Sequence, residues 1–528
     1  MDEPRGDLMW GSIPGLVRDA AERFPTVEAL VDGGTRMTFA GLGAALDQAT
    51  RALMAARVEK GDRVAIWAPN CWEWVVAALA VHGAGGVLVP INTRFKGREA
   101  GYVLERSGAR LLFTVSGFLH IDYVKLLRDE FGADPVSTIV ILRGDAPAHT
   151  TSWHDFILGS DAVSLAMAKR ATEEVSPDDM SDIMFTSGTT GKPKGVMATH
   201  GQTLRTFEVW SRLVGLREGD RYLIVNPFFH TFGYKAGFIS CLMRGATIVP
   251  HAVFDVPQVL DKIRAEKITM LPGPPTLYQS ILATRDRGDL SSLRLAVTGA
   301  APVPVELLKR MRSELTFETI LTAYGLTEST GVVTMCRPTD DNETISNSSG
   351  RAIPDTEVEI VDDDTRPVPT GEPGEIVVRG YNVMEGYYQD PQATADTIDA
   401  QGWLHTGDIG VMDERGYVQI TDRKKDMFIV GGFNAYPAEI ENDLLAHPAL
   451  AQVAVVGIPD ARMGEVGCAF VVPRAGETVD PDDVIAWAKE KMANYKVPRR
   501  VVVVDSLPLN ASGKVLKFEL REMAQKGS

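Results

Sequence analysis

Hydrophobic and polar positions alternate along most of the chain in a pattern that predicts helices between short apolar strands. From residue 30 to residue 425, apolar runs end in turns that contain glycine or proline, and a helical segment follows each turn. This alternation predicts an α/β architecture, in which turns at the carboxyl ends of the strands converge on one ligand-binding crevice. The clearest strand-and-turn pairs are residues 223–225 before 226–228, 268–271 before 272–275, 293–297 before 299–302, and 320–323 before 324–325.

The C-terminal part of the chain has a different pattern. A charged run, DRKKD at residues 422–426, precedes it, and Pro437 then opens a predicted helix at the position that proline favours. Further apolar and amphipathic segments predict a small α+β domain. We therefore predict an N-terminal domain of residues 1–424 and a C-terminal domain of residues 425–528. The predicted elements after Pro437 are strands at residues 453–456, 469–472 and 501–504, and a helix at 481–492.

Length and charge narrow the class of protein. A chain of 528 residues is too long for one hydrophobic core, so at least two domains are expected. The hydrophobic share of 45% and the charged share of 23% are ordinary for a globular protein. The net charge of −16 argues against nucleic acid and anionic membranes as partners. An anionic substrate must therefore be held by local groups.

The sequence predicts a cytoplasmic protein without a membrane span. The N-terminal residues MDEPRGDLMW lack the apolar core of a signal peptide. The most apolar stretch, residues 74–91, contains a histidine, three glycines and a proline, and it predicts a buried helix that leads into a strand. The four cysteines are widely spaced and form no C-x-x-C pair, as expected in a reducing compartment and without zinc.

The most informative segment is TSGTTGKPKG at residues 186–195, directly behind the apolar run at residues 183–185. Glycines let backbone N–H groups approach an anion, hydroxyls donate further hydrogen bonds, and lysines supply positive charge. The segment therefore predicts a loop that holds polyphosphate. The P-loop pattern G-x-x-x-x-G-K-[ST] is not satisfied, because Gly188 and Gly191 lie too close together and Pro193 follows Lys192.

This loop resembles the phosphate loop of the adenylate-forming superfamily, which includes acyl-CoA synthetases, peptide-synthetase adenylation domains and beetle luciferases. The resemblance recurs in order over almost the whole chain. It implies a large N-terminal α/β domain of several subdomains and a small, mobile α+β C-terminal domain. It also implies ATP and Mg²⁺ as cofactors and CoA as co-substrate. The phosphate-binding residues that it implies are Thr186, Ser187, Gly188, Thr189, Thr190, Gly191 and Lys194.

Two further motifs resemble the nucleotide site of the superfamily. In YGLTE, the resemblance implies that Tyr324 stacks on adenine and that Glu328 holds Mg²⁺, which favours hard carboxylate oxygens. In WLHTGD, it implies that Asp408 accepts hydrogen bonds from both ribose hydroxyls. No motif of the superfamily assigns a role to His405, which is expected to be structural. Further nucleotide contacts are implied for Gly299, Ala300, Ala301, Gly325, Thr327 and Arg423.

The C-terminal resemblance concerns the two reaction steps. Within NASGK, Lys514 matches the catalytic lysine, which would stabilise the charge that builds on the α-phosphate during adenylation. Lys425 matches the hinge about which the C-terminal domain rotates between the steps. Gly431 and Gly432 match the glycines that line the pantetheine tunnel, where any side chain would obstruct the thiol of CoA.

The acyl pocket gives a weaker signal. In the segment FFHTFGYK at residues 228–235, His230 matches the residue that guides the substrate carboxylate. The aromatic residues favour a bulky apolar acyl group. Tyr234 or Thr231 is the expected donor to a substrate ketone, and Lys235 is expected to point either to this pocket or to solvent. The segments NPFFHTFGYKAG and LPGPPTLYQS are most similar to actinobacterial ligases of steroid-ring degradation, which act on an indanedione propanoate.

The expected partners are therefore a small carboxylic acid, ATP and CoA. The sequence leaves open a medium- or long-chain fatty acid as the substrate and an amine as the final acceptor. It also leaves open whether the chain forms a homo-oligomer.

Overall fold

The computed structural model describes residues 5–186, 193–299, 303–423, 426–430, 433–460, 462–492, 494–509 and 515–526, without the side chains of residues 422, 423, 433 and 434. The chain divides into two compact units. The first consists of Met1–Glu357 and Val378–Leu404, and the second of Val358–Val377 and His405–Ser528. The chain therefore enters the second unit, returns to the first, and enters the second again.

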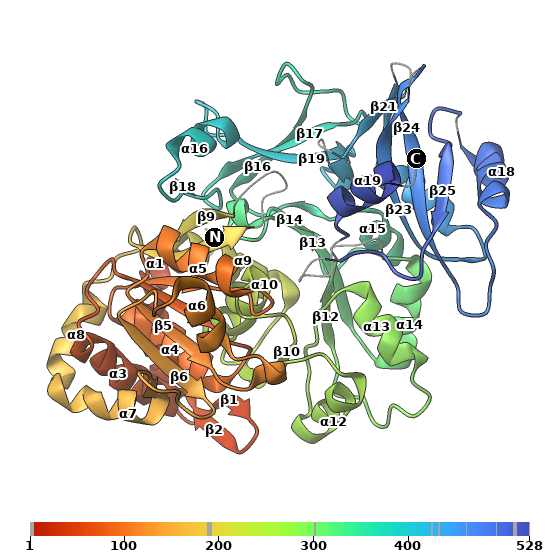
Figure 1. Ribbon diagram of the computed structural model, residues 1–528. Helices are drawn as coiled ribbons and strands as arrows, with labels where there is room; N and C mark the ends of the chain where they lie inside the picture. The colour runs from red at the N-terminus through yellow and green to blue at the C-terminus, as the bar shows by residue number, and fades with distance from the viewer. Residues whose placement is uncertain are drawn as a thin grey trace. The chain divides into compact units, whose positions relative to one another are not determined.

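An eight-stranded sheet forms a large part of the first unit (Figure 1). Its strand order is β18-β9-β8-β4-β3-β5-β6-β7, and the pairs from β8 through β7 are parallel. Strands β8, β9 and β18 are joined by antiparallel pairs. The strands are β3 (Arg63–Trp67), β4 (Val87–Pro90), β5 (Leu111–Val115), β6 (Thr138–Arg143), β7 (Thr151–Ser152), β8 (Met180–Thr186), β9 (Lys194–Thr199) and β18 (Gly386–Tyr387).

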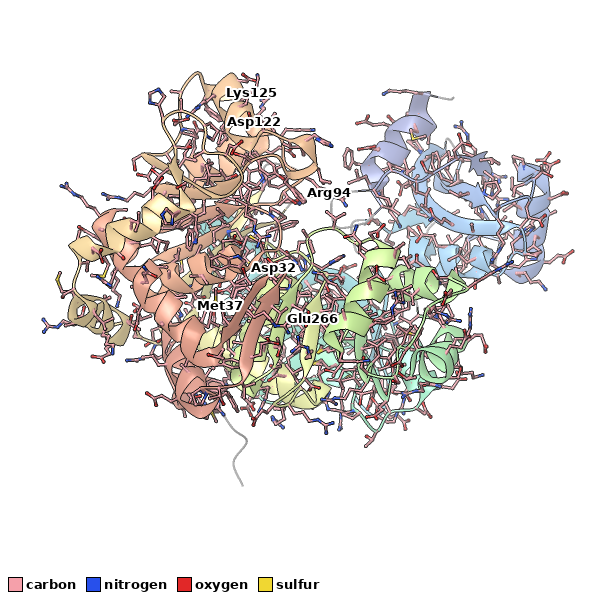
Figure 2. All side chains as sticks on the ribbon, turned by 90° about the horizontal axis from the view of Figure 1, so that it is seen from below. Asp32, Met37, Arg94, Asp122, Lys125 and Glu266 are labelled. Carbon is pink, nitrogen blue, oxygen red and sulfur yellow. The ribbon has the colours of Figure 1, made fainter. Side chains whose placement is uncertain are left out.

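Helices alternate with these strands, as the sequence pattern predicts. The apolar stretch at 74–91 forms a fully buried helix followed by β4, so this prediction is confirmed. Asp122 accepts a hydrogen bond from the Lys125 N–H at the start of one helix, where both residues are labelled in Figure 2. The helices are α1 (Gly6–Trp10), α2 (Ile13–Arg23), α3 (Phe39–Ala55), α4 (Trp72–Gly83), α5 (Gly97–Ser107), η1 (Phe118–His120), α6 (Tyr123–Phe131), α7 (Trp153–Leu158), η2 (Gly159–Ala162), α8 (Leu165–Glu173), α9 (His200–Val214) and α16 (Pro391–Thr397).

A second sheet of the first unit contains the predicted strand-and-turn pairs. Strands β10, β11 and β1 are parallel, and Met270 bridges β10 to β12, which pairs in parallel with β13. The predicted strand at residues 268–271 thus contributes only isolated bridges, through Met270. The strands are β1 (Glu28–Asp32), β2 (Thr35–Thr38), β10 (Arg221–Ile224), β11 (Thr247–Pro250), β12 (Leu295–Thr298), β13 (Thr319–Tyr324), β14 (Thr334–Met335) and β15 (Arg351–Ala352).

The helices around this sheet follow its turns. One of them is a π-helical turn, η3 (Tyr234–Ile239), which begins within the predicted acyl segment; π-turns are rare and occur frequently at functional sites. The other helices are α10 (Thr231–Gly233), α11 (Ser240–Arg244), α12 (Val256–Glu266), α13 (Pro275–Ala283), α14 (Val305–Leu315), η4 (Thr327–Ser329) and α15 (Asn342–Asn347). Among the described residues, no helix combines the length and the apolar content needed to cross a bilayer.

The second unit contains two sheets. One has the order β16-β17-β19-β20, and the other combines β21 to β25 around a core of buried Val, Ala and Leu side chains. The predicted α+β pattern after residue 426 is therefore confirmed. The elements are β16 (Thr356–Val361), β17 (Gly374–Gly380), β19 (Leu404–Met412), β20 (Val418–Arg423), β21 (Phe428–Val430), β22 (Phe433–Ala435), α17 (Pro437–Leu445), β23 (Leu450–Asp460), β24 (Gly464–Pro473), α18 (Pro481–Lys491), β25 (Arg500–Val503) and α19 (Lys517–Lys526).

Candidate active site

The predicted phosphate loop joins two antiparallel strands. Thr186 ends β8 and lies opposite Lys194, which begins β9. The Tyr102 hydroxyl on α5 donates a hydrogen bond of 3.2 Å to the Pro193 carbonyl, so it supports the second end of the loop. A hairpin distinguishes this segment from a P-loop, which leads into a helix. The predicted phosphate contacts Ser187, Gly188, Thr189, Thr190 and Gly191 lie outside the described residues.

Strand β18 lies beside this hairpin and contacts the YGLTE turn. The Tyr387 hydroxyl donates a hydrogen bond of 3.0 Å to Oε1 of Glu328. The Lys194 Nζ lies 4.9 Å from the centroid of the Tyr387 ring, within the range of a cation–π interaction. Burial, reinforced by Glu328, raises the pKa of Tyr387 far above its usual range, so its hydroxyl keeps its proton and remains a donor. Tyr387 therefore contacts two of the predicted site residues.

The predicted adenine residues lie on neighbouring parallel strands. Gly299 follows β12, Tyr324 ends β13, and the pair Thr298 and Thr322 fixes the register between the strands. A Cβ atom at Gly299 would lie 3.3 Å from the Ala323 carbonyl oxygen, so a larger residue would press on the next strand. Tyr324 is buried. The structure thus brings Gly299 and Tyr324 together, while Ala300 and Ala301 lie outside the described residues.

The turn that carries Glu328 requires its glycine. A Cβ atom at Gly325 would lie 2.3 Å from the Gly331 carbonyl oxygen, which excludes any larger residue. Thr327 begins η4 and is half-buried. The Glu328 carbonyl accepts a hydrogen bond from the Met384 N–H, so the backbone of this turn is fixed to the segment before β18.

The Glu328 carboxylate is suitable for Mg²⁺ that is shared with phosphates. No cluster of three or more His, Cys, Asp or Glu side chains in the described parts of the chain could hold a metal by itself. Mg²⁺ typically uses only one or two carboxylates together with substrate phosphates. Glu328 is half-buried and its Oε1 is held by Tyr387, so this site fits a phosphate-bound cation and does not fit an all-protein cage.

The last four residues of the predicted ribose motif, from His405 to Asp408, belong to the second unit. Asp408 is buried on β19, opposite Arg423 on β20, whose side chain is not described. Glu375 holds the turn that precedes Asp408, a role that sequence analysis did not predict. The buried Glu375 carboxylate accepts a hydrogen bond from the Gly407 N–H at 3.0 Å and lies 3.4 Å from Nδ1 of His405. The expected structural role of His405 agrees with this contact.

The remaining C-terminal predictions lie outside the described residues. These are Lys425, Gly431, Gly432 and Lys514. Leu509 and Val515, on either side of the NASGK segment, form an antiparallel bridge.

The predicted acyl segment is divided between exposed and buried residues. His230 is exposed, and its Nδ1 accepts a hydrogen bond from the Phe232 N–H at 3.2 Å, at the start of α10. Phe232 is half-buried and contacts Trp210 edge to face. A Cβ atom at Gly233 would lie 2.2 Å from the Pro227 carbonyl oxygen, so the segment folds back tightly on itself. Phe229 is half-buried as well, so Phe229, His230 and Phe232 are the residues of this segment that remain accessible to a ligand.

The expectations for Tyr234 and Lys235 are wrong. Tyr234 is fully buried, and a hydrogen bond of 2.7 Å joins its hydroxyl to Nε2 of His82. Lys235 is 1% exposed, and its Nζ lies 3.0 Å from Oδ2 of Asp182 on β8. Both side chains belong to the core behind the segment, so neither donates to a substrate ketone. Thr231, the other expected donor, is also buried.

The fold and the site place the chain in a known class of enzyme. Residues 17–388 match the family described as AMP-binding enzyme, and residues 439–514 match its C-terminal domain. The chain belongs to the AMP-binding enzyme family. The resemblance that the sequence motifs indicate is therefore confirmed, and so is the predicted fold class.

Particular relatives narrow this class. The chain is 52% identical to the 3-[(3aS,4S,7aS)-7a-methyl-1,5-dioxo-octahydro-1H-inden-4-yl]propanoyl:CoA ligase of Rhodococcus jostii (strain RHA1), over 96% of this chain and 98% of the relative. It is 49% identical to the ligase of the same name from Mycobacterium tuberculosis, over 97% and 99%. It is also similar to the solved structure of o-succinylbenzoate CoA synthetase from Bacillus subtilis with ATP and a magnesium ion. That match has a TM-score of 0.80 and 33% identity, and it covers 96% and 98% of the two chains.

Proposed function

We propose that this protein is an ATP-dependent acid:CoA ligase that activates the bicyclic indanedione propanoate of steroid-ring degradation. The observation that carries the proposal is the sequence identity of about 50%, over nearly the full length of the chain, to two ligases named for that substrate. The reaction has two steps. The carboxylate and ATP give an acyl-adenylate and pyrophosphate, and CoA then displaces AMP to give the thioester.

The first step requires positioning and charge stabilisation, without a nucleophilic side chain. Tyr324 stacks on the adenine, and Asp408 accepts hydrogen bonds from the ribose. The loop from Thr186 to Lys194 binds the β- and γ-phosphates, and Lys514 stabilises the charge on the α-phosphate. Glu328 would hold Mg²⁺, which when bound would neutralise further phosphate charge.

His230 guides the attacking carboxylate toward the α-phosphate. The observation that supports this role is its exposure at the start of α10, after the strand β10. The carboxyl ends of parallel strands converge on one side of a sheet, and the adenine residues lie at the ends of β12 and β13 in the same sheet.

The second step requires a different arrangement, because Lys514 must leave before CoA can enter. The chain from residue 425 onward rotates about Lys425 as a C-terminal domain, and Gly431 and Gly432 then line the path of pantetheine. Glycine suits this path because a side chain would block the thiol.

The experiment that tests the proposal compares acids. Purified enzyme with ATP and CoA is assayed on the indanedione propanoate, octanoate and palmitate, and hydroxylamine replaces CoA in a parallel series. A rigid bicycle loses less conformational freedom on binding than an alkyl chain, so we expect kcat/KM to favour it by at least about a hundredfold, or about 2.7 kcal/mol. Equal or faster turnover of straight-chain acids indicates a fatty acyl-CoA ligase instead. Formation of the hydroxamate without any thioester in the series with CoA shows that the acid is adenylated but that CoA is not the acceptor.

A further inference from the structure

Tyr387 contacts two residues of the predicted phosphate site that are distant in the chain, Glu328 and Lys194. Its hydroxyl donates to Glu328 on the η4 turn, and its ring face lies against the ammonium group of Lys194, which begins β9. We propose that Tyr387 is a positioning residue for phosphate and metal binding, which fixes the Glu328 carboxylate and orients Lys194. This proposal rests on the proposed function, because it assumes that Glu328 and Lys194 bind the nucleotide.

The bond to Tyr387 determines where the Glu328 carboxylate lies. A glutamate side chain has three rotatable bonds, and a half-buried carboxylate without a partner samples several rotamers. Here Oε1 accepts the Tyr387 hydroxyl at 3.0 Å, which fixes the direction of the carboxylate. The second oxygen, Oε2, accepts no hydrogen bond from the described residues. The carboxylate is therefore oriented in advance and retains one oxygen for a cation.

Tyr387 is itself held firmly enough to act in this way. It is 8% exposed and packs in an apolar cluster with Val196 and Met384. Its backbone pairs with Val196 on β9, and its N–H donates to Oγ1 of Thr394 at 2.9 Å. The position of its ring is thus set by the same strand that carries Lys194, so the hairpin and the Glu328 turn share one rigid contact.

The interaction with Lys194 supplies the second part of the argument. Lys194 is exposed and has a long, flexible side chain, and its Nζ lies 4.9 Å from the Tyr387 centroid. The electron-rich ring face attracts a cation in this geometry. Tyr387 therefore favours a conformation of Lys194 in which the ammonium group lies over the ring whose hydroxyl binds Glu328, so that one side chain orients both a lysine and a metal-binding carboxylate toward a shared polyphosphate.

Tyr387→Phe tests the hydroxyl while it keeps the ring. In the presence of ATP and without acid or CoA, thermal unfolding is followed as Mg²⁺ is added, so the readout does not depend on turnover. We expect the Mg²⁺ concentration that gives half of the ATP-induced stabilisation to rise about tenfold, equivalent to about 1.4 kcal/mol. Binding of AMP without Mg²⁺ should not change. An unchanged Mg²⁺ requirement overturns the proposal.

Tyr388→Phe provides the matched control. It removes a hydroxyl from the next residue of the chain, which makes no hydrogen bond to Glu328, and both residues lie in the described part of the chain. We expect its Mg²⁺ requirement to equal that of the wild type. An equal rise in both variants would indicate a general effect of the altered segment and would count against a specific role of Tyr387.

Glu328→Gln separates this proposal from the proposed function. If Glu328 binds Mg²⁺, this variant raises the Mg²⁺ requirement, and adding Tyr387→Phe to it has little further effect, because the two residues act through one contact. If Glu328→Gln has no effect, the metal assignment in the proposed function is wrong. If Glu328→Gln raises the requirement while Tyr387→Phe does not, only the positioning role is wrong.

Discussion

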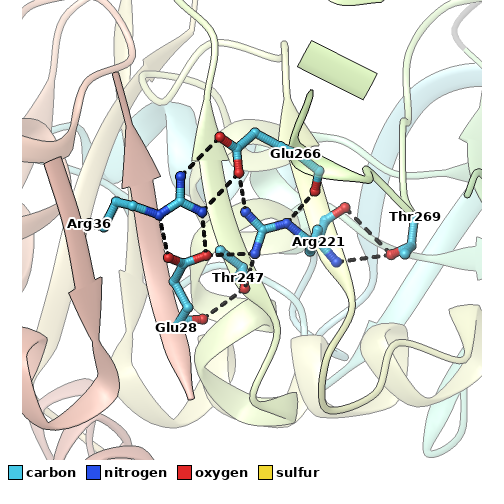
Figure 3. Close-up of polar contacts among 6 residues, drawn as sticks. All are labelled: Glu28, Arg36, Arg221, Thr247, Glu266 and Thr269. Atoms are coloured by element: carbon cyan, nitrogen blue, oxygen red, sulfur yellow. Dashed lines mark hydrogen bonds and ion pairs between the residues drawn. The ribbon is translucent and has the colours of Figure 1, made fainter. Parts of the chain in front are cut away.

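Two groups of charges hold strands that lead into the candidate site, and they differ in their exposure to water. Lys235 and Asp182 form an isolated ion pair in which both side chains are 1% exposed, and Asp182 lies on β8 ahead of the phosphate loop. Glu28, Arg36, Arg221 and Glu266 form a network at the surface, where Arg221 begins β10 ahead of the acyl segment (Figure 3).

In the network, each charge has two partners. The Arg36 guanidinium contacts Glu28 at 2.6 and 3.0 Å and both oxygens of Glu266 at 3.0 Å. Arg221 contacts Glu28 at 2.6 Å and also pairs with Glu266. Hydrogen bonds from Arg36 lower the pKa of Glu266. The side chain of Arg36 is 49% exposed, so water can replace any single partner.

In the core, water cannot replace a lost partner. Asp182 accepts one further hydrogen bond, from the Ser181 hydroxyl. Burial lowers the pKa of Lys235, although the neighbouring Asp182 charge opposes that shift. The comparison therefore teaches that the number of ion pairs is a poor guide to their importance. Removing one partner of the buried pair should matter more than removing Arg36, the exposed member of the network, which is otherwise half-buried.

The largest effect is expected for Lys235→Met. This change leaves the Asp182 carboxylate buried without its counter-charge, so we expect the free energy of unfolding to fall by about 3–5 kcal/mol. Urea unfolding at pH 7.5 measures this loss. Combining the change with Asp182→Asn removes both charges and should restore most of the stability. A loss below about 1 kcal/mol in the single variant would show that the pair is not isolated from water.

An intermediate effect is expected from acid, because two neutral histidines lie near the buried pair. Desolvation lowers the pKa of His200 to about 3 and that of His82 well below its usual value. Their rings lie 5.1 Å apart, and Nδ1 of His200 accepts a hydrogen bond from the Ile13 N–H. The unfolded chain therefore binds protons that the folded chain does not.

The sign and the pH window follow from these shifts. Stability from His200 is complete above about pH 6.5 and is lost as pH falls toward about 3, by up to about 1.4 kcal/mol per pH unit. The contribution of Glu266 to the network begins to be lost at a lower pH than that of His200, because the pKa of Glu266 lies below its usual value of about 4.5 and this carboxylate stays charged until then. Urea unfolding between pH 7.5 and 5.5 should show a shallower pH dependence for His200→Gln than for the wild type. Equal slopes would contradict the neutral, buried state of His200.

The smallest effect is expected for Arg36→Ala. Three charges of the network remain and water solvates the two glutamates, so we expect a loss of less than about 1 kcal/mol, which decreases further in about 1 M salt. Unfolding in low and high salt measures it. Lys125→Ala removes one partner of an exposed, isolated pair with Asp129 and serves as the control without a network. A salt-independent loss in Arg36→Ala would indicate packing of its side chain as the cause.

The sequence predicted those features that depend on residues close together in the chain. Strands β10, β12 and β13 are recognisable because each apolar run ends at a glycine or proline turn, and parallel pairing brings those turns to one edge. The buried helix α4 is recognisable because nearly every position is apolar. The sequence also correctly indicated an α/β fold with a smaller α+β part.

The errors concern contacts between segments that are distant in the chain. A lysine next to aromatic residues indicates a polar surface unless its partner is known, and the partner of Lys235 is Asp182 on another strand. The same limit explains why Tyr234 was expected to face a substrate, since only the fold places His82 at its hydroxyl. Tyr387 and Glu375 were missed because their partners, Glu328 and Gly407, are fixed by sheet pairing and not by spacing.

The path of the chain between the two units has a consequence for cutting the protein into fragments. Strand β19 lies between β17 and β20, yet the segment that connects β17 to β19 belongs to the first unit, which contains residues 378–404. A fragment that begins at His405 therefore lacks the strand that covers one side of β19, and it exposes an unpaired edge that promotes aggregation. During synthesis, β17 likewise emerges before its partner strand β19, and the segment between them folds as part of the first unit. An exchange of the C-terminal part between relatives at a single cut before His405 therefore pairs β17 of one parent with β19 of the other.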